Sequence, residues 1–337
     1  MERTQFCEAP IEQLRRPIGD LLLAFDAAER AVVNEGHLIP AALAERAFSA
    51  FDHLVVEFNR LVADAPPLAA EALGRELQAA LLPFIQMART AGRAYAKPCG
   101  YAGDYLTIAQ MYENCPAGTG RLGGLTDACF LSLPCSVAVR NRRALFCDVI
   151  QKLFMRNLGR RVRVASLACG PACEIFDVYR GIEAARRIET TLIDIDREAI
   201  SGLQEKIVAL NLQDSIRCKI ANLALVAKGR TPLNLHNQDL IYSIGLIDYF
   251  ADEIVIGLLD AIHDALAPGG SVIVGNFHPR NPSRAVMDHV LEWKLIYRTE
   301  EDMQRLFLAS AFRRDPDRVF YESQGINLFA ECRREET

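Results

Sequence analysis

One stretch decides how this sequence folds: VRVASLACGPACEIF, residues 162–176. Its first seven residues form an apolar run with the length of a buried strand, and a helical pattern follows its last residues. The small residues between Ala168 and Ala172 allow a tight backbone turn to approach a ligand closely. We therefore expect a strand, a turn and a helix whose first N–H groups are open to a ligand.

Further apolar runs alternate with helical stretches after this point, and they are residues 187–196, 215–221, 239–245 and 270–277. Such alternation predicts an α/β fold, with a parallel sheet that helices cover on both faces. Two last runs, 317–323 and 326–334, are separated only by Gln324 and Gly325. This short separation predicts an antiparallel hairpin at the end of the sheet.

The N-terminal part of the chain predicts helices. Apolar residues recur at helical spacing in three stretches, 11–34, 41–63 and 68–90. Residues 95–133 are rich in turn formers, so we expect a loop, a short helix from about Asp104 and a second loop up to residue 133. A strong helix follows over 134–158. The prediction is an all-helical cap domain, residues 1–133, and a ligand-binding domain, residues 134–337.

Composition narrows the function classes. The 337 residues carry a formal charge of −5, so no basic excess draws the chain to nucleic acid or to an anionic membrane. No uncharged apolar run reaches about 20 residues, and the N-terminus lacks the apolar segment of a secretion signal. The ten cysteines form no paired framework, and CGPAC (169–173) has neither zinc nor redox spacing. We expect reduced thiols, no metal and a cytoplasmic protein.

A ligand is expected at the carboxyl ends of the parallel strands. Roughly twenty residues after the Gly170 turn, the second run ends in Asp194 and Asp196, where a carboxylate can accept hydrogen bonds from both ribose hydroxyls of a nucleoside. Asp196 has the position of a helix N-cap, so Asp194 is the expected ligand. The GxGxxG pattern that cradles a pyrophosphate is absent, which favours S-adenosylmethionine over NAD or FAD.

The region from about residue 160 to residue 334 resembles the class I S-adenosylmethionine-dependent methyltransferases. The resemblance rests on five motifs in order: VASLACGPACEI, LIDID, IANL, DLIYSIGLIDYF and LAPGGSVIVGNF. It implies a Rossmann-like fold whose seven-stranded sheet is mostly parallel with an antiparallel last strand, together with an all-helical N-terminal cap. One departure is Ser166, where the family commonly has an acidic residue.

The same resemblance implies the cofactor contacts. The turn with Ala168, Gly170 and Pro171 would line the methionine end of S-adenosylmethionine, and Asp194 would bind its ribose. The remaining implied contacts are Ile195, Asn222 and Leu223 at the adenine, and Ser243 and Ile244 beside the sulfonium.

Two segments ahead of the first motif support narrower resemblances. CGYAGDY (99–105) and VRNRR (139–143) are similar to segments of bacterial proteins assigned to methyl-ester formation on a 3-hydroxy fatty acid. The general plan, a helical cap on this fold, is also similar to that of azetidine-2-carboxylate synthases. Those enzymes cyclise the methionine portion of the cofactor and release methylthioadenosine.

The CGYAGDY segment has two interpretations. Its glycines could allow a hinged lid whose tyrosines close over the cofactor, where the face of a tyrosine ring can hold a sulfonium. In this interpretation Tyr105 is a candidate cofactor contact and Tyr101 a candidate catalytic residue. Alternatively, the segment is a glycine-rich connection in which Asp104 caps the next helix.

The VRNRR segment also has two interpretations. Arg140 and Arg143 lie three residues apart on one helix, and one of them, with Arg140 as our assignment, could hold a carboxylate of the cofactor or of a substrate. Asn141 could orient an amine or a carboxylate during catalysis. The alternative is a solvated helix face with salt bridges.

Two residues near strand ends are candidates for chemistry on the acceptor. Asp248 follows the fourth run, at the rim where an acceptor would enter, and its alternative role is a helix cap. His278 follows the fifth run and could act as a general base, although a loop histidine beside proline is usually structural.

Methyl transfer is an in-line displacement that needs alignment and little acid–base help, and a carboxylate acceptor needs no base. We therefore expect a methyltransferase for a small, carboxylate-bearing molecule. Cyclisation of the cofactor and a catalytically silent cofactor-binding module are the alternatives. The expected partner is a small-molecule substrate, without nucleic acid or membrane, and the terminal hairpin could offer the edge of a homodimer.

Overall fold

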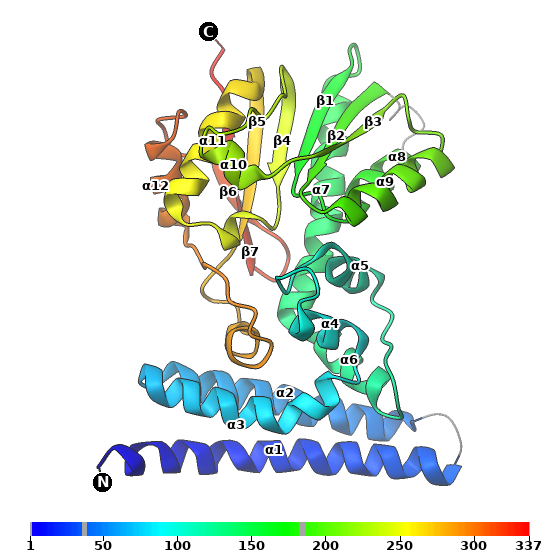
Figure 1. The fold of residues 1–337 in the computed structure, drawn as a ribbon, viewed down its shortest axis with the longest axis vertical. Helices are drawn as coiled ribbons and strands as arrows, with labels where there is room; N and C mark the ends of the chain where they lie inside the picture. Colours follow the sequence, from blue (N-terminus) through cyan, green and yellow to red (C-terminus); the bar gives the residue numbers. More distant parts are fainter. Residues whose placement is uncertain (1, 36–38, 182–186, 337) are drawn as a thin grey trace. The chain divides into compact units, whose positions relative to one another are not determined.

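The computed structural model divides the chain into two compact units (Figure 1), and it describes residues 2–35, 39–181 and 187–336. We call Met1–Val137 with Arg280–Lys294 the helical unit, and Ala138–Pro279 with Leu295–Thr337 the sheet unit. The sequence prediction divided the chain after residue 133 and kept 134–337 together. The structure instead assigns the segment 280–294 to the helical unit.

The described part of the sheet unit contains a seven-stranded sheet in the order β3-β2-β1-β4-β5-β7-β6. Strands β1 to β5 pair in parallel, whereas β7 runs antiparallel to both β5 and β6. The predicted fold class, including the antiparallel last strand and the terminal hairpin, is therefore confirmed. The strands are β1 Val162–Leu167, β2 Ile188–Asp194, β3 Ile216–Ile220, β4 Gln238–Ser243, β5 Leu266–Phe277, β6 Arg318–Tyr321 and β7 Asn327–Arg333.

Helices cover both faces of this sheet (Figure 1) because alternate strand side chains are apolar on both sides. In β1, Val164 packs in one buried cluster with α7, α8 and α9, while Ala165 packs in the other with α10, α11 and α12. These helices are α7 Pro134–Arg156, α8 Cys173–Gly181, α9 Arg197–Ala209, α10 Leu223–Ala227, α11 Asp252–Ala265 and α12 Glu300–Ala309. The two cores fix the sheet between them and leave its carboxyl edge to carry polar groups.

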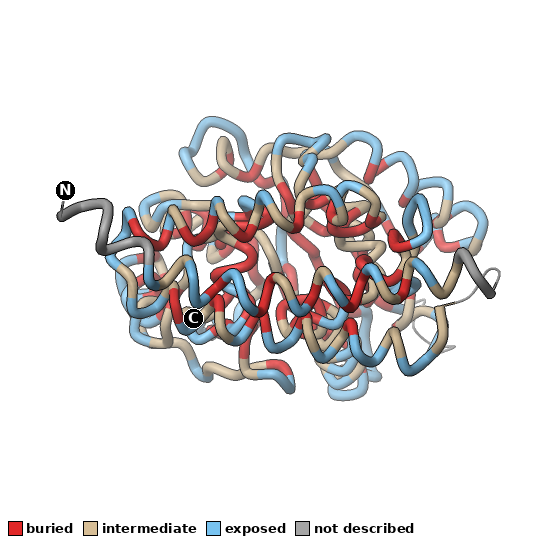
Figure 2. Tube along the Cα trace, turned by 90° about the horizontal axis from the view of Figure 1, so that it is seen from below, coloured by how far each residue is buried: buried red, intermediate tan, exposed pale blue. Residues whose placement is uncertain are grey.

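The helical unit is built from helices with one buried side, as the alternation of buried and exposed residues in Figure 2 shows. Phe51 and Phe58 of α2 and Leu73 and Leu77 of α3 are among its buried residues. Its elements are α1 Glu2–Glu35, α2 Ala41–Ala63, α3 Pro67–Ile85, α4 Arg89–Ala96, α5 Tyr105–Glu113, α6 Gly123–Ser132 and the short π-helical segment η3 Val286–Val290. The expected all-helical character of the N-terminal region is confirmed.

The predicted second loop, which ended at residue 133, is wrong in its last part, because α6 occupies residues 123–132. The glycines that suggested a loop serve close backbone packing instead. A Cβ atom on Gly118 or Gly123 would collide with the carbonyl oxygen of Met87. Residues Ala88 and Gly118 also form an isolated β-bridge. Glycine here indicates contact between backbone segments, which composition alone cannot distinguish from a turn.

The turn between β6 and β7 is built around one buried carboxylate, Glu322. Its Oε1 accepts hydrogen bonds from the N–H groups of Ile326 (2.8 Å) and Asn327 (3.2 Å). Its Oε2 accepts from the Gln324 N–H (2.7 Å) and from the side-chain amide of Asn141 (3.0 Å). Four donors around one buried group fix the hairpin turn at the carboxyl edge of the sheet.

Replacing Glu322 with alanine should destabilise the protein by roughly 2–4 kcal/mol, because several buried donors would lose their acceptor at once. Urea unfolding followed by circular dichroism measures the change. The matched control is Glu205→Ala on the exposed side of α9, which should change stability by less than about 0.5 kcal/mol. Equal effects of the two variants would contradict the assigned role of Glu322.

Candidate active site

The turn after β1 has a strained backbone. Ala168, Gly170 and Ala172 adopt positive φ angles of 52°, 50° and 46°. Glycine tolerates this conformation, but each alanine there costs about 1 kcal/mol or more. Strain of this kind persists only where surrounding contacts fix the backbone, and it concentrates at functional sites.

Asp194, the last residue of β2, holds this turn in place. Its Oδ2 accepts a hydrogen bond from the Gly170 N–H (2.8 Å), and its Oδ1 accepts from the Asp196 N–H (3.0 Å). Only 6% of Asp194 is exposed. Asp196 caps α9 through the N–H groups of Glu198 and Ala199, so the predicted capping role is confirmed. Each Asp194 oxygen can accept a further hydrogen bond, and ribose hydroxyls are donors of the required kind.

An apolar surface lies beside Asp194. Ile195 and Ile220 are 54% and 49% exposed, which is unusual for isoleucine. Residues Asp194 and Ile220 are direct partners in the pairing of β2 with β3, so both isoleucines lie at the same end of these strands. A carboxylate next to two exposed apolar side chains suits a nucleoside, whose ribose is polar and whose base is flat and apolar. The sequence analysis missed Ile220, which lies next to last in its apolar run and is the last residue of β3, as Asp194 is of β2.

The side chains of two other predicted adenine contacts, Asn222 and Leu223, stabilise the fold. The Asn222 carboxamide oxygen caps α10 by accepting from the N–H groups of Ala224 (3.0 Å) and Leu225 (3.2 Å). The Leu223 side chain is buried in the apolar core. The cofactor contacts of Asn222 and Leu223 stay predictions.

The end of β4 lies beside the end of β1. The Ser243 hydroxyl donates to the carbonyl of Leu167 (2.9 Å), and the carbonyl of Ile244 accepts from Nη1 of Arg142 (2.8 Å). The strand order reverses direction between β1 and β4, and open α/β sheets bind ligands at such a point. The residues that the resemblance placed at the methionine end and the sulfonium, including Pro171, therefore line one edge.

The VRNRR segment lies in α7, and the structure separates its side chains. Arg143 forms two hydrogen bonds to Asp177, Nε to Oδ2 (2.6 Å) and Nη2 to Oδ1 (2.9 Å), so the salt-bridge alternative is correct for it. Asn141 uses its amide N–H to bind Glu322, and Arg140 is half-buried. The assigned roles of Arg140 and Asn141 stay predictions. Arg142, which the sequence analysis passed over, is the arginine at the strand edge.

A buried carboxyl lies under the turn after β1. Glu174, in the first turn of α8, accepts a hydrogen bond from the Tyr242 hydroxyl (2.8 Å), and burial raises the pKa of Glu174. Ser166 also hydrogen-bonds to Tyr242, whose pKa burial raises well above its usual value. Ser166, at the position where the family commonly has an acidic residue, and Glu174 therefore bond to the same tyrosine.

Asp248 is a further buried carboxyl of this edge, in the short helical turn η2 Ile247–Tyr249. Its Oδ1 accepts from the Phe277 N–H (2.7 Å), and it does not cap α11. Burial raises its pKa to about 6, although the positive charges of Arg142 and Arg298 act in the opposite direction. A carboxyl with this pKa can exchange a proton near neutral pH, so its predicted catalytic role stays open.

Arg298 holds the backbone around Asp248. It is buried, and its Nη1 donates to the carbonyl of Ile247 (2.7 Å) while its Nη2 donates to that of Phe250 (2.6 Å). Nη1 also donates to the Asn276 side chain (2.9 Å). A guanidinium with several fixed acceptors leaves the η2 turn little freedom, so Asp248 keeps one position.

His278 follows β5 and lies beside a carboxylate. Its Nε2 is 3.2 Å from Oε2 of Glu300, and Oε1 of Glu300 accepts from the hydroxyl of Tyr321. These contacts orient the imidazole, which is compatible with both the structural and the general-base interpretation.

The two candidate tyrosines, Tyr101 and Tyr105, belong to the helical unit. Between them, Asp104 is fully buried, accepts from the Thr107 N–H (2.8 Å) and pairs with Arg93 (2.8 Å). Its capping role is therefore confirmed. The lid function of the tyrosines stays a prediction.

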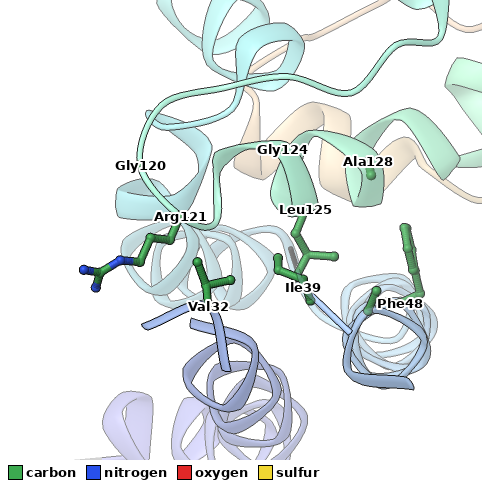
Figure 3. Close-up of a pocket in the computed structure, with 9 residues that line it drawn as sticks. Val32, Ile39, Phe48, Gly120, Arg121, Gly124, Leu125 and Ala128 are labelled. Carbon is green, nitrogen blue, oxygen red and sulfur yellow. The ribbon is translucent and has the colours of Figure 1, made fainter. Parts of the chain in front are cut away.

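The helical unit contains a pocket of about 470 Å³ between α1, α2 and α6 (Figure 3). Val32, Ile39 and Leu125 lie close together in it, while the guanidinium of Arg121 points away from them. The residues that line this pocket offer apolar contact but no converging polar groups. The carboxyl edge of the sheet therefore remains the candidate active site.

Two further observations concern partners and metals. None of the helices in the described ranges is long and apolar enough to cross a membrane. Among the same residues, no three His, Cys, Asp or Glu side chains are grouped in a way that could hold a metal ion.

Several solved structures are similar to this chain. A possible exported protein from Bordetella parapertussis is 17% identical, with a TM-score of 0.55, and the match covers 95% of this chain and 97% of that chain. Magnesium protoporphyrin IX methyltransferase from Synechocystis PCC 6803 is 12% identical, with a TM-score of 0.49, over 73% and 99% of the two chains. The CurJ carbon methyltransferase is 13% identical, with a TM-score of 0.48, over 99% and 93%. At these identities the first likeness shows the fold alone.

No curated protein matches this sequence. A family model described as "Putative methyltransferase" matches residues 48–326, which is most of the chain. A methyltransferase with this fold takes its methyl group from S-adenosylmethionine, and the residues at the sheet edge suit its nucleoside, so the predicted cofactor is confirmed. The chain belongs to this methyltransferase family.

Proposed function

We propose that this protein transfers the methyl group of S-adenosylmethionine to a small, carboxylate-bearing acceptor. The observation that carries the proposal is the Asp194 carboxylate, which is fixed against the Gly170 turn at the point where the strand order reverses. A fixed acceptor for ribose hydroxyls beside exposed apolar side chains gives a nucleoside one orientation along the edge.

Each group at the edge then has a stated task. Asp194 binds the ribose, and Ile195 and Ile220 contact the adenine. When bound, S-adenosylmethionine supplies a methyl group that its sulfonium already activates. The chain therefore needs to align the acceptor and exclude water, and it needs little proton transfer.

The proposed acceptor is small because the chain carries a net charge of −5 and no basic stripe for nucleic acid. An ionised carboxylate can attack the methyl group without losing a proton. If the attacking group is a hydroxyl or an amine, Asp248 and His278 are the residues at this edge that can take up its proton.

The test is incubation of the purified protein with S-adenosylmethionine alone, followed by mass spectrometry against a control without enzyme. The proposal expects unchanged cofactor, and S-adenosylhomocysteine only when a carboxylate acceptor is added, beginning with 3-hydroxy acids. Enzyme-dependent methylthioadenosine with azetidine-2-carboxylate would replace the proposal by cofactor cyclisation. Absence of any binding of S-adenosylmethionine by calorimetry would contradict both reactions.

The Asp194→Ala variant should bind S-adenosylhomocysteine at least about 10-fold more weakly than the wild type, because two ribose hydroxyls lose a charged acceptor. Isothermal titration calorimetry measures the affinity, and a thermal melt checks that the variant folds. Asp214→Ala, at an exposed turn position, serves as the control and should bind normally. Unchanged affinity of the Asp194 variant would refute the ribose assignment.

The raised pKa of Asp248 predicts a pH-dependent stability. Between its ordinary pKa of 3.8 and its folded value of about 6, the folded protein keeps a proton that the unfolded chain has released. The contribution of Asp248 to stability therefore falls as the pH rises through this window.

The Asp248→Asn variant removes this titration and keeps the oxygen that accepts from Phe277. It should match the wild type near pH 4 and exceed it by up to about 3 kcal/mol at pH 7. Urea unfolding at a series of pH values measures the difference. A variant that is less stable than the wild type at pH 7 would show that Asp248 gains more from its charged partners than it loses by burial.

A further inference from the structure

Arg142 is a buried arginine whose hydrogen-bonding capacity is mostly unused. It is only 5% exposed, and its one hydrogen bond within the described residues runs from Nη1 to the carbonyl of Ile244 (2.8 Å). Its Nε is buried without an acceptor among those residues. A guanidinium presents Nε and Nη2 as a fork that matches the two oxygens of a carboxylate. An unfilled fork in a buried position indicates that a ligand supplies the acceptor.

The neighbours of Arg142 leave room for such a ligand. A Cβ atom on Gly245 would lie 3.2 Å from Nη1 and 3.3 Å from Nη2, so glycine at this position keeps a side chain off the guanidinium. The two nearby buried carboxyls are bonded elsewhere, Glu174 to the Tyr242 hydroxyl and Asp248 to the Phe277 N–H. Neither carboxyl forms an ion pair with Arg142, although both feel its positive charge.

The place of Arg142 along the sheet edge indicates which carboxylate it binds. If Asp194 at β2 holds the ribose and Ile220 at β3 flanks the base, the rest of the cofactor extends in the other direction, across β1 toward β4. Neighbouring strands are about 4.8 Å apart, so the end of β4 is roughly 10 Å from that of β2. An extended methionine portion spans such a distance and ends in a carboxylate.

We infer that Arg142 binds the carboxylate of the methionine portion of S-adenosylmethionine through its Nε and Nη2 edge. This inference rests on the proposed function, and it assigns a binding role to a residue that sequence spacing did not select. The bond would fix the end of the cofactor opposite to the ribose and thereby set the position of the sulfonium between the two anchors.

The test compares two ligands that differ only in the carboxylate, S-adenosylmethionine and its decarboxylated form, by isothermal titration calorimetry. The wild type should prefer S-adenosylmethionine by about 10- to 100-fold, which is the range for a charged hydrogen-bonded pair. In Arg142→Met this preference should fall to about 1, while binding of the decarboxylated ligand changes little. Arg142→Lys, which keeps the charge but loses the fork, should retain a small preference.

The matched control is Arg143→Met, on the same helix, because Arg143 is paired with Asp177 and should leave the preference intact. If Arg142→Met does not fold in a thermal melt, the same ligand comparison is made with Arg142→Lys and Gly245→Ala. A methyl group at position 245 crowds the guanidinium and should also lower the preference for S-adenosylmethionine. A preference that is the same in the wild type and in these variants would overturn the inference but leave the proposed function standing. A wild type that binds neither ligand would instead contradict the proposed function.

Discussion

The hydrogen bond from the Gly170 N–H to the Asp194 carboxylate is the constraint on which the site depends. It joins the turn after β1 to the end of β2, and it fixes a backbone in which Ala168 and Ala172 adopt a left-handed conformation. The strained turn persists because the Asp194 carboxylate accepts hydrogen bonds from two backbone groups. One is the Asp196 N–H, which follows β2, and the other is the Gly170 N–H, which follows the neighbouring strand β1. The same carboxylate is the proposed ribose ligand, so the group that stabilises the turn is also the group proposed to position the cofactor against it.

The remainder of the carboxyl edge is fixed in a similar way, by buried polar groups with defined partners. Glu322 accepts hydrogen bonds from the N–H groups of the β6–β7 turn, and Arg298 donates to carbonyl groups of the η2 turn. Glu174 accepts a hydrogen bond from Tyr242 near the turn after β1. Such networks stabilise a site only when each polar group has a hydrogen-bond partner. The desolvation penalty of an unpaired buried polar group exceeds the net stabilisation that one hydrogen bond provides. Arg142 departs from this pattern, and that departure supports a role in ligand binding.

The sequence predicted the sheet well because its strands are buried on both faces, and burial leaves continuous apolar runs that few other structures require. The position of Asp194 at the carboxyl edge was also predictable, because it lies near the end of the second run, and its role as a ribose ligand stays a prediction. The place of Arg142 at the strand edge was not predictable. Helical spacing shows which side chains share a face of a helix, but it does not show which face packs against the sheet. Spacing grouped Arg140 with Arg143, and Arg143 proved to bind Asp177. Helix α6 was missed because a segment that needs glycines for close packing has the same glycine-rich composition as a turn.

The two unusual charges at the end of β4 are connected. Arg142 favours the ionised form of Asp248, which burial opposes, and the balance places the pKa of Asp248 at about 6. A carboxylate bound to the Arg142 fork would offset part of that positive charge and act to raise the pKa of Asp248, whereas the ammonium and sulfonium charges of the same cofactor would act to lower it. The charges of a bound cofactor and the protonation of Asp248 are therefore coupled through Arg142.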